Sequence, residues 1–187
     1  MHIVLDQRTD HRDLELCFGA MSEAIGVLLT FPTYGTHLHG ADTSSVSRNH
    51  RNWGSPTLPS NPAWQDQARR LMAEPEFMLG AHDRKLVLTS IIDACSYRAW
   101  HLFCVHIRTN HLHAVLKTDL PVDRAVTYMK ARATFVLKTY HPNRQRFWTK
   151  HGSTRYLWNR ASMAAALGYV MNQQGSRMES WMCGSMP

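Results

Sequence analysis

The chain has 187 residues, a length typical of one domain with attachments and sufficient to bury a core without disulfide bonds. Its 44% of hydrophobic and 19% of charged residues are ordinary for a soluble globular protein, and no apolar run is long enough to cross a membrane. The net charge of +7 favours a polyanionic partner such as nucleic acid, although a merely basic enzyme would look the same. Four scattered cysteines without Cys-x-x-Cys spacing argue against a zinc ribbon and favour a cytoplasmic location.

The N-terminal part of the chain divides into an extension, a strand and a long loop. Residues 1–20 are charged and weakly periodic, so we expect a mobile extension, or an upstream start with the natural protein beginning at Met21. A single domain then covers 21–187. Its first element is a short apolar run at 24–31, which predicts a buried strand. The segment 35–62 is rich in Gly, Pro, Ser and Asn and has no periodicity, so it predicts a long loop of the kind that is usually functional or disordered.

Apolar periodicity, together with turn and cap residues, predicts the elements that follow. The expected helices are 62–72, 81–100, 121–140 and 161–175, and the expected strands are 100–107, 111–117 and 153–158. The order from the first strand is strand, helix, strand, strand, helix, strand and a terminal helix. It predicts an α+β fold of the ferredoxin-like split β-α-β type, an antiparallel sheet with helices on one face and a further C-terminal helix.

Two segments contain His-Leu-His: "YGTHLHGADT" with His37 and His39, and "RTNHLHAVLK" with His111 and His113. Side chains two residues apart on a strand share a face, so His111 and His113 could bind one divalent ion. Two imidazoles hydrogen-bonded at a sheet surface are the more common outcome for such a pair taken alone. His37 and His39 lie between glycines in the predicted loop, where they would contact DNA. We expect Asn110 to orient His111.

The predicted terminal helix contains "LGYVMNQQG", in which Tyr169 and Gln173 are one turn apart. A tyrosine can be a covalent nucleophile, and a glutamine oxygen can bind Mg²⁺ or Mn²⁺. Tyr128 is the rival nucleophile, but it lies within an apolar helix stripe and no glutamine follows it. Gly168 would let the helix pivot or let DNA approach closely, or else it packs closely against the sheet.

These motifs together resemble the single-tyrosine HUH transposases, which include the REP-associated tyrosine transposases and their insertion-sequence relatives. The block "RTNHLHAVLK" resembles the family's second strand, and "LLTFPTYGTHLHG" resembles the opening strand and turn of one branch. The blocks "YMKARATFVLK", "RFWTKHGSTRYLW" and "LGYVMNQQG" resemble the following helix, aromatic strand and catalytic helix, in the same order. The resemblance covers about residues 25–175, while 1–20 and the tail "SRMESWMCGSMP" have no counterpart.

The resemblance implies metal-dependent cleavage and strand transfer of single-stranded DNA. His111, His113 and Gln173 would bind Mg²⁺ or Mn²⁺, and Tyr169 would attack the phosphodiester to give a 5′-phosphotyrosine link and a free 3′-OH. It also implies a DNA hairpin near the cleavage site, a homodimer, and a bacterial cytoplasmic protein associated with the nucleoid.

Basic residues gather between 124 and 155, where they predict a phosphate-binding surface, although part of them would suit a solvated helix face equally well. The expected DNA contacts there are Lys130, Arg132, Lys150 and Arg155. Tyr156 and Trp158 alternate with other residues of the last predicted strand; such aromatics are usually core, although bases could stack on them.

Two other functions stay open. A domesticated relative would bind DNA hairpins without cutting them, and a metal hydrolase would use activated water. The set of His111, His113 and Tyr169 favours strand transfer, because a pure binder needs no metal pair opposite a tyrosine. A hydrolase would not need Tyr169 and would want a carboxylate near the pair.

Overall fold

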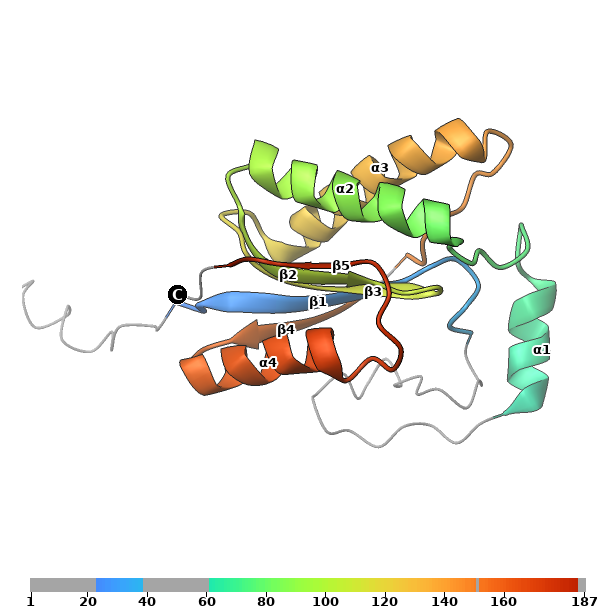
Figure 1. Ribbon diagram of the computed structural model, residues 1–187. Coiled ribbons are helices and arrows are strands. Elements are labelled where there is room, and N and C mark those ends of the chain that lie inside the picture. Colours follow the sequence, from blue (N-terminus) through green and yellow to red (C-terminus); the bar gives the residue numbers. More distant parts are fainter. Residues whose placement is uncertain (1–22, 39–60, 151, 185–187) are drawn as a thin grey trace, which may run out of the picture.

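The structure, a computed structural model, describes residues 23–38, 61–150 and 152–184 (Figure 1). The predicted extension 1–20, His39 and most of the predicted loop lie outside the described residues. The strands are β1 (Gly26–Pro32), β2 (His101–Ile107), β3 (His111–Lys117), β4 (Ser153–Leu157) and β5 (Ser180–Met182). The helices are α1 (Pro62–Arg70), α2 (Ala81–Tyr97), α3 (Val122–Tyr140) and α4 (Arg160–Asn172).

The five strands form one antiparallel sheet in the order β4-β1-β3-β2-β5. The first four strands follow the predicted ferredoxin-like pattern, in which β1 and β3 are the central neighbours and pair from Val27–Leu116 to Pro32–His111. The short strand β5 was not predicted. It pairs with the outer edge of β2 and thereby covers backbone groups that an edge strand leaves unpaired.

Helices α2 and α3 cover one face of the sheet, and α4 covers the other (Figure 1). The alternation of β1 explains how one strand serves both layers. Val27, Leu29 and Phe31 enter the core beneath α2 and α3, whereas Leu28 enters the core beneath α4. The predicted α+β class, with helices on one face and a separate C-terminal helix, is confirmed.

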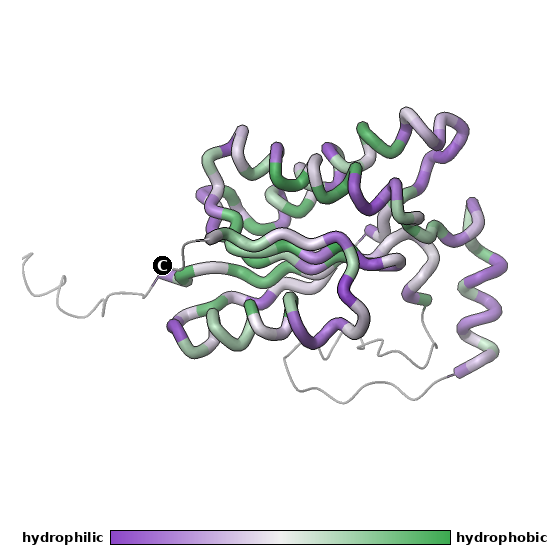
Figure 2. The backbone as a smooth tube through the Cα atoms, viewed as in Figure 1, coloured by the Kyte–Doolittle hydropathy of each residue, from purple (hydrophilic) through white to green (hydrophobic). Residues whose placement is uncertain are grey.

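The helices differ in how much of their surface is buried. In α3 the buried residues recur every fourth position, at Ala125, Met129, Ala133 and Leu137, which gives one continuous apolar stripe. Helix α1 has no buried residue and is largely hydrophilic (Figure 2). No helix within the described ranges is long and apolar enough to cross a membrane.

Helix α4 is shorter than the prediction of 161–175. It begins after Asn159, whose side chain accepts a hydrogen bond from the backbone N–H of Ser162 at 2.8 Å. It ends at Asn172, and Gln173 is already the C-terminal cap with non-helical backbone angles. The chain then turns through Gly175, which has a positive φ of 72°. This early end decides which glutamine faces the sheet.

Candidate metal and nucleophile site

The predicted imidazole pair lies on β3, on the face that α4 covers. His111 and His113 are side by side, with ring centroids 4.7 Å apart, while Leu112 between them points into the opposite core. In the strand register, Thr30 of β1 and His106 of β2 are the direct neighbours of His113 on either side. The pair is therefore held in a row of polar side chains across three strands.

Both ring nitrogens of His113 have hydrogen-bond partners. Its Nδ1 lies 2.7 Å from Thr30 Oγ1, and its Nε2 lies 3.0 Å from Gln174 Oε1. Because an amide oxygen only accepts, Nε2–H donates to Gln174 and the Thr30 hydroxyl donates to Nδ1. The amide nitrogen of Gln174 donates to the carbonyl of Tyr169 at 3.2 Å, which directs Oε1 toward the imidazole.

His111 is oriented from its own strand. Its Nδ1 lies 2.7 Å from Asn110 Oδ1, the residue expected to orient it. Since Oδ1 accepts, Nδ1 carries the proton and Nε2 presents its lone pair, which is the form that binds a metal ion. The ring of His37 lies edge-on to His111, with a centroid separation of 6.2 Å. His37, expected to contact DNA from a loop, thus stands next to the pair.

Both imidazoles of the pair are neutral at physiological pH. Burial lowers the pKa of His111 to about 4, and the neighbouring His37 and Arg108 add to the effect. Burial also lowers the pKa of His113 to about 3, with a further contribution from His111. Neutral imidazole is the metal-binding form, so an incoming cation would displace no proton from either ring. It would require only a change of tautomer at His113.

The site offers the imidazole nitrogens of His111 and His113 and the amide oxygen of Gln174. Among the described residues no group of three His, Cys, Asp or Glu side chains could hold a metal ion, so a third protein ligand must come from another residue type. His113 Nε2 and Gln174 Oε1 lie 3.0 Å apart, at the distance of the hydrogen bond that joins them. His111, His113 and Gln174 are therefore the residues that could hold Mg²⁺ or Mn²⁺.

Gln174 thus occupies the place for which the sequence suggested Gln173. The one-turn spacing from Tyr169 to Gln173 holds only while the helix continues, and α4 ends at Asn172. Gln173 is exposed, and its backbone N–H donates to the Tyr169 carbonyl at 3.2 Å. The side chain of the next glutamine turns back toward β3 instead.

Tyr169 lies beside the pair within the same chain. Its ring centroid is 5.3 Å from that of His113, and 39% of the residue is exposed, so a substrate can reach it. Gly168 is not closely packed, because a Cβ built there would meet nothing within 4 Å. The rival Tyr128 belongs to α3 on the other face of the sheet, where its ring lies 5.7 Å from that of Trp100.

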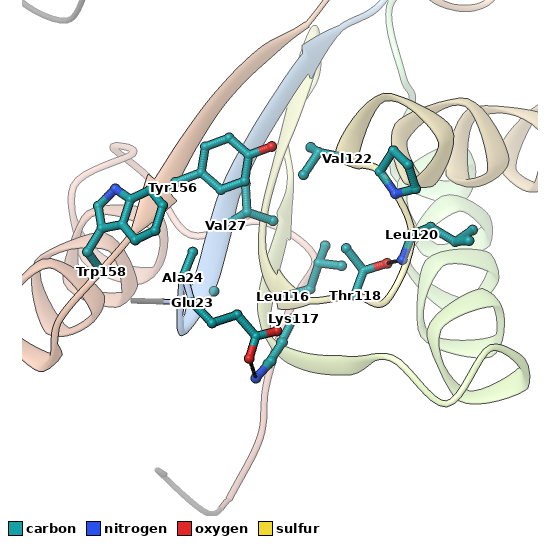
Figure 3. Close-up of a pocket in the computed structure, with 12 residues that line it drawn as sticks. Glu23, Ala24, Val27, Leu116, Lys117, Thr118, Leu120, Val122, Tyr156 and Trp158 are labelled. Atoms are coloured by element: carbon teal, nitrogen blue, oxygen red, sulfur yellow. Dashed lines mark hydrogen bonds and ion pairs between the residues drawn. The ribbon is translucent and has the colours of Figure 1, made fainter. Parts of the chain in front are cut away.

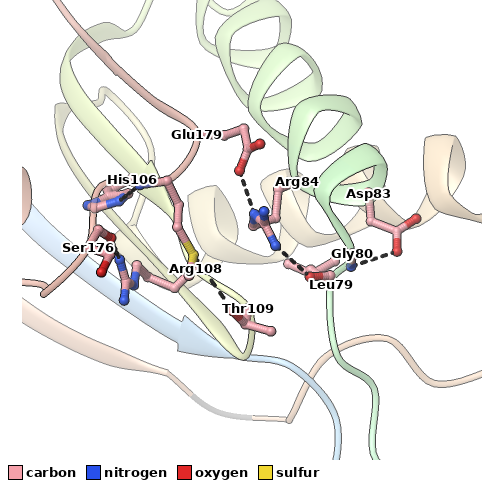
Figure 4. A network of polar contacts seen from close by, with 10 residues as sticks. Leu79, Gly80, Asp83, Arg84, His106, Arg108, Thr109, Ser176 and Glu179 are labelled. Atoms are coloured by element: carbon pink, nitrogen blue, oxygen red, sulfur yellow. Dashed lines mark hydrogen bonds and ion pairs between the residues drawn. The ribbon is translucent and has the colours of Figure 1, made fainter.

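The segment after α4 is fastened to the sheet by a polar network (Figure 4). His106 Nδ1 lies 2.9 Å from the carbonyl of Val170, and its Nε2 accepts from the backbone N–H of Met178 at 3.2 Å. Arg108 donates to the carbonyl of Ser176, and Arg84 pairs with Glu179. His106 therefore joins the end of the tyrosine helix to the strand beside the imidazole pair.

The four basic residues expected to bind DNA do not form one surface. Lys130 and Arg132 are on α3, and the Lys130 ammonium donates to the carbonyl of Thr149 at 2.8 Å. Burial lowers the pKa of Lys130 to about 8. Arg155 pairs with Leu28 in the register of β4 and β1, which places it on the α4 face. Lys150 is exposed just before β4.

Sequence reasoning missed four polar residues that the fold brings to the site: Thr30, His106, Arg108 and Gln174. Two of these had a signal, since a short hairpin turn places His106 opposite His113 and Arg108 opposite His111. No sequence signal indicated Thr30, because the register of β1 against β3 depends on the whole sheet.

Comparisons with known proteins find likenesses among solved structures only. No family model matches the sequence, and no curated protein is similar to it. Among solved structures, the chain is similar to a REP-associated tyrosine transposase bound to a REP hairpin, with a TM-score of 0.47 and 10% sequence identity. The match covers 79% of this chain and 65% of that chain.

Proposed function

We propose that this chain is a metal-dependent enzyme that cleaves single-stranded DNA through covalent attack by Tyr169 and transfers the broken strand. The observation that carries the proposal is the meeting of three groups within one chain. The Tyr169 ring lies 5.3 Å from the ring of His113, and Gln174 joins the two residues by hydrogen bonds at 3.2 Å and 3.0 Å.

The chemistry follows from these groups. The Tyr169 phenol loses its proton, its oxygen forms a bond to phosphorus, and the bond from phosphorus to the 3′ oxygen breaks. The 3′ oxygen leaves with a proton, so the products are a 5′-phosphotyrosine link and a free 3′-OH. Because the link conserves the bond energy, the 3′-OH of another strand can reverse the step without ATP.

The side chains around Tyr169 prepare the site. A Mg²⁺ or Mn²⁺ ion held by His111, His113 and Gln174 would polarise a phosphate oxygen and stabilise the charge of the transition state. Asn110 and Thr30 orient the two imidazoles. We further propose that the DNA carries a hairpin near the cleavage site and that the enzyme acts in the cytoplasm, at the nucleoid.

The test is a covalent adduct on a denaturing gel, formed from single-stranded DNA of both flanks of the gene with Mn²⁺. We expect the adduct with wild type and with the control Tyr128→Phe, and none with Tyr169→Phe. An adduct formed by Tyr169→Phe would refute the assignment of the nucleophile. Tight, metal-independent hairpin binding without any adduct would instead support the domesticated binding module.

A further inference from the structure

A second candidate site lies at the far end of β3 from His111 (Figure 3). A cavity of about 670 Å³ opens there among β1, β4, the end of β3 and the first turn of α3. It lies at Lys117, six residues from His111, which corresponds to about 20 Å along a strand. The cavity is therefore separate from the imidazole pair.

The cavity combines an apolar floor with a polar rim. The floor consists of small and aliphatic side chains: Ala24, Val27, Leu116, Leu120 and Val122. At the rim, Lys117 Nζ lies 3.4 Å from Glu23 Oε2. The volume is within the range of about 300 to 1,000 Å³ in which proteins bind small organic groups.

Two aromatic rings form one wall of the cavity, across from Leu120 and Val122 (Figure 3). Tyr156 lies on β4 and Trp158 two residues later, and their ring centroids are 5.9 Å apart with planes inclined at 32°. They are 50% and 54% exposed, so neither is the core residue that such aromatics usually are. Exposed ring faces beside an apolar cavity are suited to a flat aromatic ligand.

The charged groups around the cavity are of both signs. Lys117 at the rim and the exposed Arg124 in the first turn of α3 are cationic, whereas Glu23 at the rim and the exposed Asp119 and Asp123 beside the lining residues are anionic. The ion pair of Lys117 with Glu23 is largely solvent-exposed, with side chains 49% and 83% accessible. Such pairs contribute little, so the pair does not close the rim to an incoming ligand.

We propose that this cavity binds an unpaired nucleobase of single-stranded DNA, stacked on Tyr156 and Trp158. The proposal rests on the proposed function for the identity of the polymer. It adds a second contact with the DNA, on the opposite face of the sheet from the imidazole pair and about 20 Å farther along β3.

The experiment compares two fluorescein-labelled probes of equal charge, a thymidine 12-mer and a 12-mer of abasic sites, by fluorescence anisotropy. We expect wild type to bind the thymidine 12-mer more tightly. Tyr156→Ala and Trp158→Ala should each weaken that binding roughly 5- to 100-fold, as expected for loss of one base–aromatic stack, and leave abasic binding unchanged. Trp158→Phe should retain most of the affinity. Phe135→Ala, an exposed aromatic on α3, is the matched control and should bind as wild type does.

Several outcomes would overturn the proposal. One is an unchanged affinity of folded Trp158→Ala for the thymidine 12-mer, with folding checked by circular dichroism. A second is an equal loss of affinity of Trp158→Ala for the thymidine and the abasic 12-mer. A third is wild type that binds neither 12-mer. If Trp158→Ala lowers the sedimenting mass without changing DNA affinity, the occupant is a second copy of the chain. The covalent adduct with Tyr169 is measured separately, so either proposal can fail while the other stands.

Discussion

The hydroxyl of Thr30 suits the candidate site because it can both donate and accept a hydrogen bond. In the metal-free arrangement it donates to His113 Nδ1, at 2.7 Å, while Nε2 donates to Gln174. If His113 bound the proposed metal ion through Nε2, Nδ1 would carry the proton and the same hydroxyl could accept from it. Thr30 thus supports both tautomers of His113 without moving.

Replacing Thr30 tests this dual role. Thr30→Val keeps the shape and strand preference of the side chain but removes the hydroxyl, so we expect Mn²⁺ affinity to fall about 10-fold or more, as for other supporting partners of metal ligands. Isothermal titration of Mn²⁺ measures the effect. Thr30→Ser should restore the affinity, and Thr154→Val, an exposed threonine of β4, should leave it unchanged. Equal affinities of Thr30→Val and wild type would refute the role.

The imidazole pair also predicts how stability depends on pH. Burial depresses the pKa of His111 to about 4 and of His113 to about 3, from an ordinary value of 6.5. Below about pH 6.5 the unfolded chain takes up protons that the folded chain does not, so acid favours unfolding. The penalty is absent above that pH and grows as the pH falls toward the folded-state values.

Urea unfolding of the metal-free protein checks this prediction. We expect the midpoint to fall between pH 7 and pH 4.5, and to fall less in His113→Asn, which lacks one of the depressed groups. His101→Asn, at the exposed start of β2, should fall as wild type does. A pH dependence of His113→Asn equal to that of wild type would contradict the prediction.

At the scale of elements, helix α4 carries the proposed nucleophile Tyr169, and a side chain at Gly168 would have room. A Cβ at Gly168 would meet nothing within 4 Å, whereas alanine stabilises a helix interior by roughly 1 kcal/mol relative to glycine. Close packing against the sheet, one explanation of this glycine, is therefore excluded. The remaining explanations are a pivot of the helix at Gly168 and a close approach of DNA, and we propose the second.

We expect Gly168→Ala to raise the melting temperature by about 2 to 4 °C and yet to reduce adduct formation, because a methyl group would stand where the DNA approaches. Differential scanning calorimetry and the adduct gel give the two readouts. Ala165→Gly, at an exposed position of the same helix, should lower the melting temperature and leave the adduct unchanged. Unimpaired adduct formation by Gly168→Ala would show that DNA does not approach there.

Helices and strands with a clear apolar periodicity could be predicted from the sequence. Features that depend on where a helix or strand ends could not. The stripe from Ala125 to Leu137 predicts α3, and the alternation around His111 and His113 predicts β3 and the shared face of the pair. That the side chain of Gln174, and not that of Gln173, reaches His113 depends on where α4 ends. Local sequence specifies the end of a helix poorly. The three-residue strand β5 is too short for any period, and only the edge of β2 defines it.

At the scale of the whole molecule, the parts of the site come from one chain. The Tyr169 ring, the imidazole pair and Gln174 meet without a second copy, although a homodimer was expected. His106 holds the end of the tyrosine helix on its own sheet through Val170 at 2.9 Å. We therefore expect each chain to form its own site, whether or not a homodimer forms.

Mixing two inactive variants tests the arrangement. Tyr169→Phe and His113→Ala should each form no adduct, and their mixture should form none, because each chain lacks one half of its own site. Recovered adduct in the mixture would show that the tyrosine helix of one chain serves the imidazoles of another. A mixture of wild type with Tyr169→Phe serves as the positive control.

The order of the site's parts along the chain has a consequence for biosynthesis. Thr30 and His113 are 83 positions apart in the sequence and are joined by a hydrogen bond. Both are translated before β4 and α4. Tyr169 leaves the ribosome's catalytic centre 56 residues after His113, a delay of roughly 3 to 11 seconds at typical rates of translation. A nascent chain therefore possesses its imidazole pair before it possesses a nucleophile. A DNA-cutting activity of the proposed kind would begin only after translation has passed the last helix.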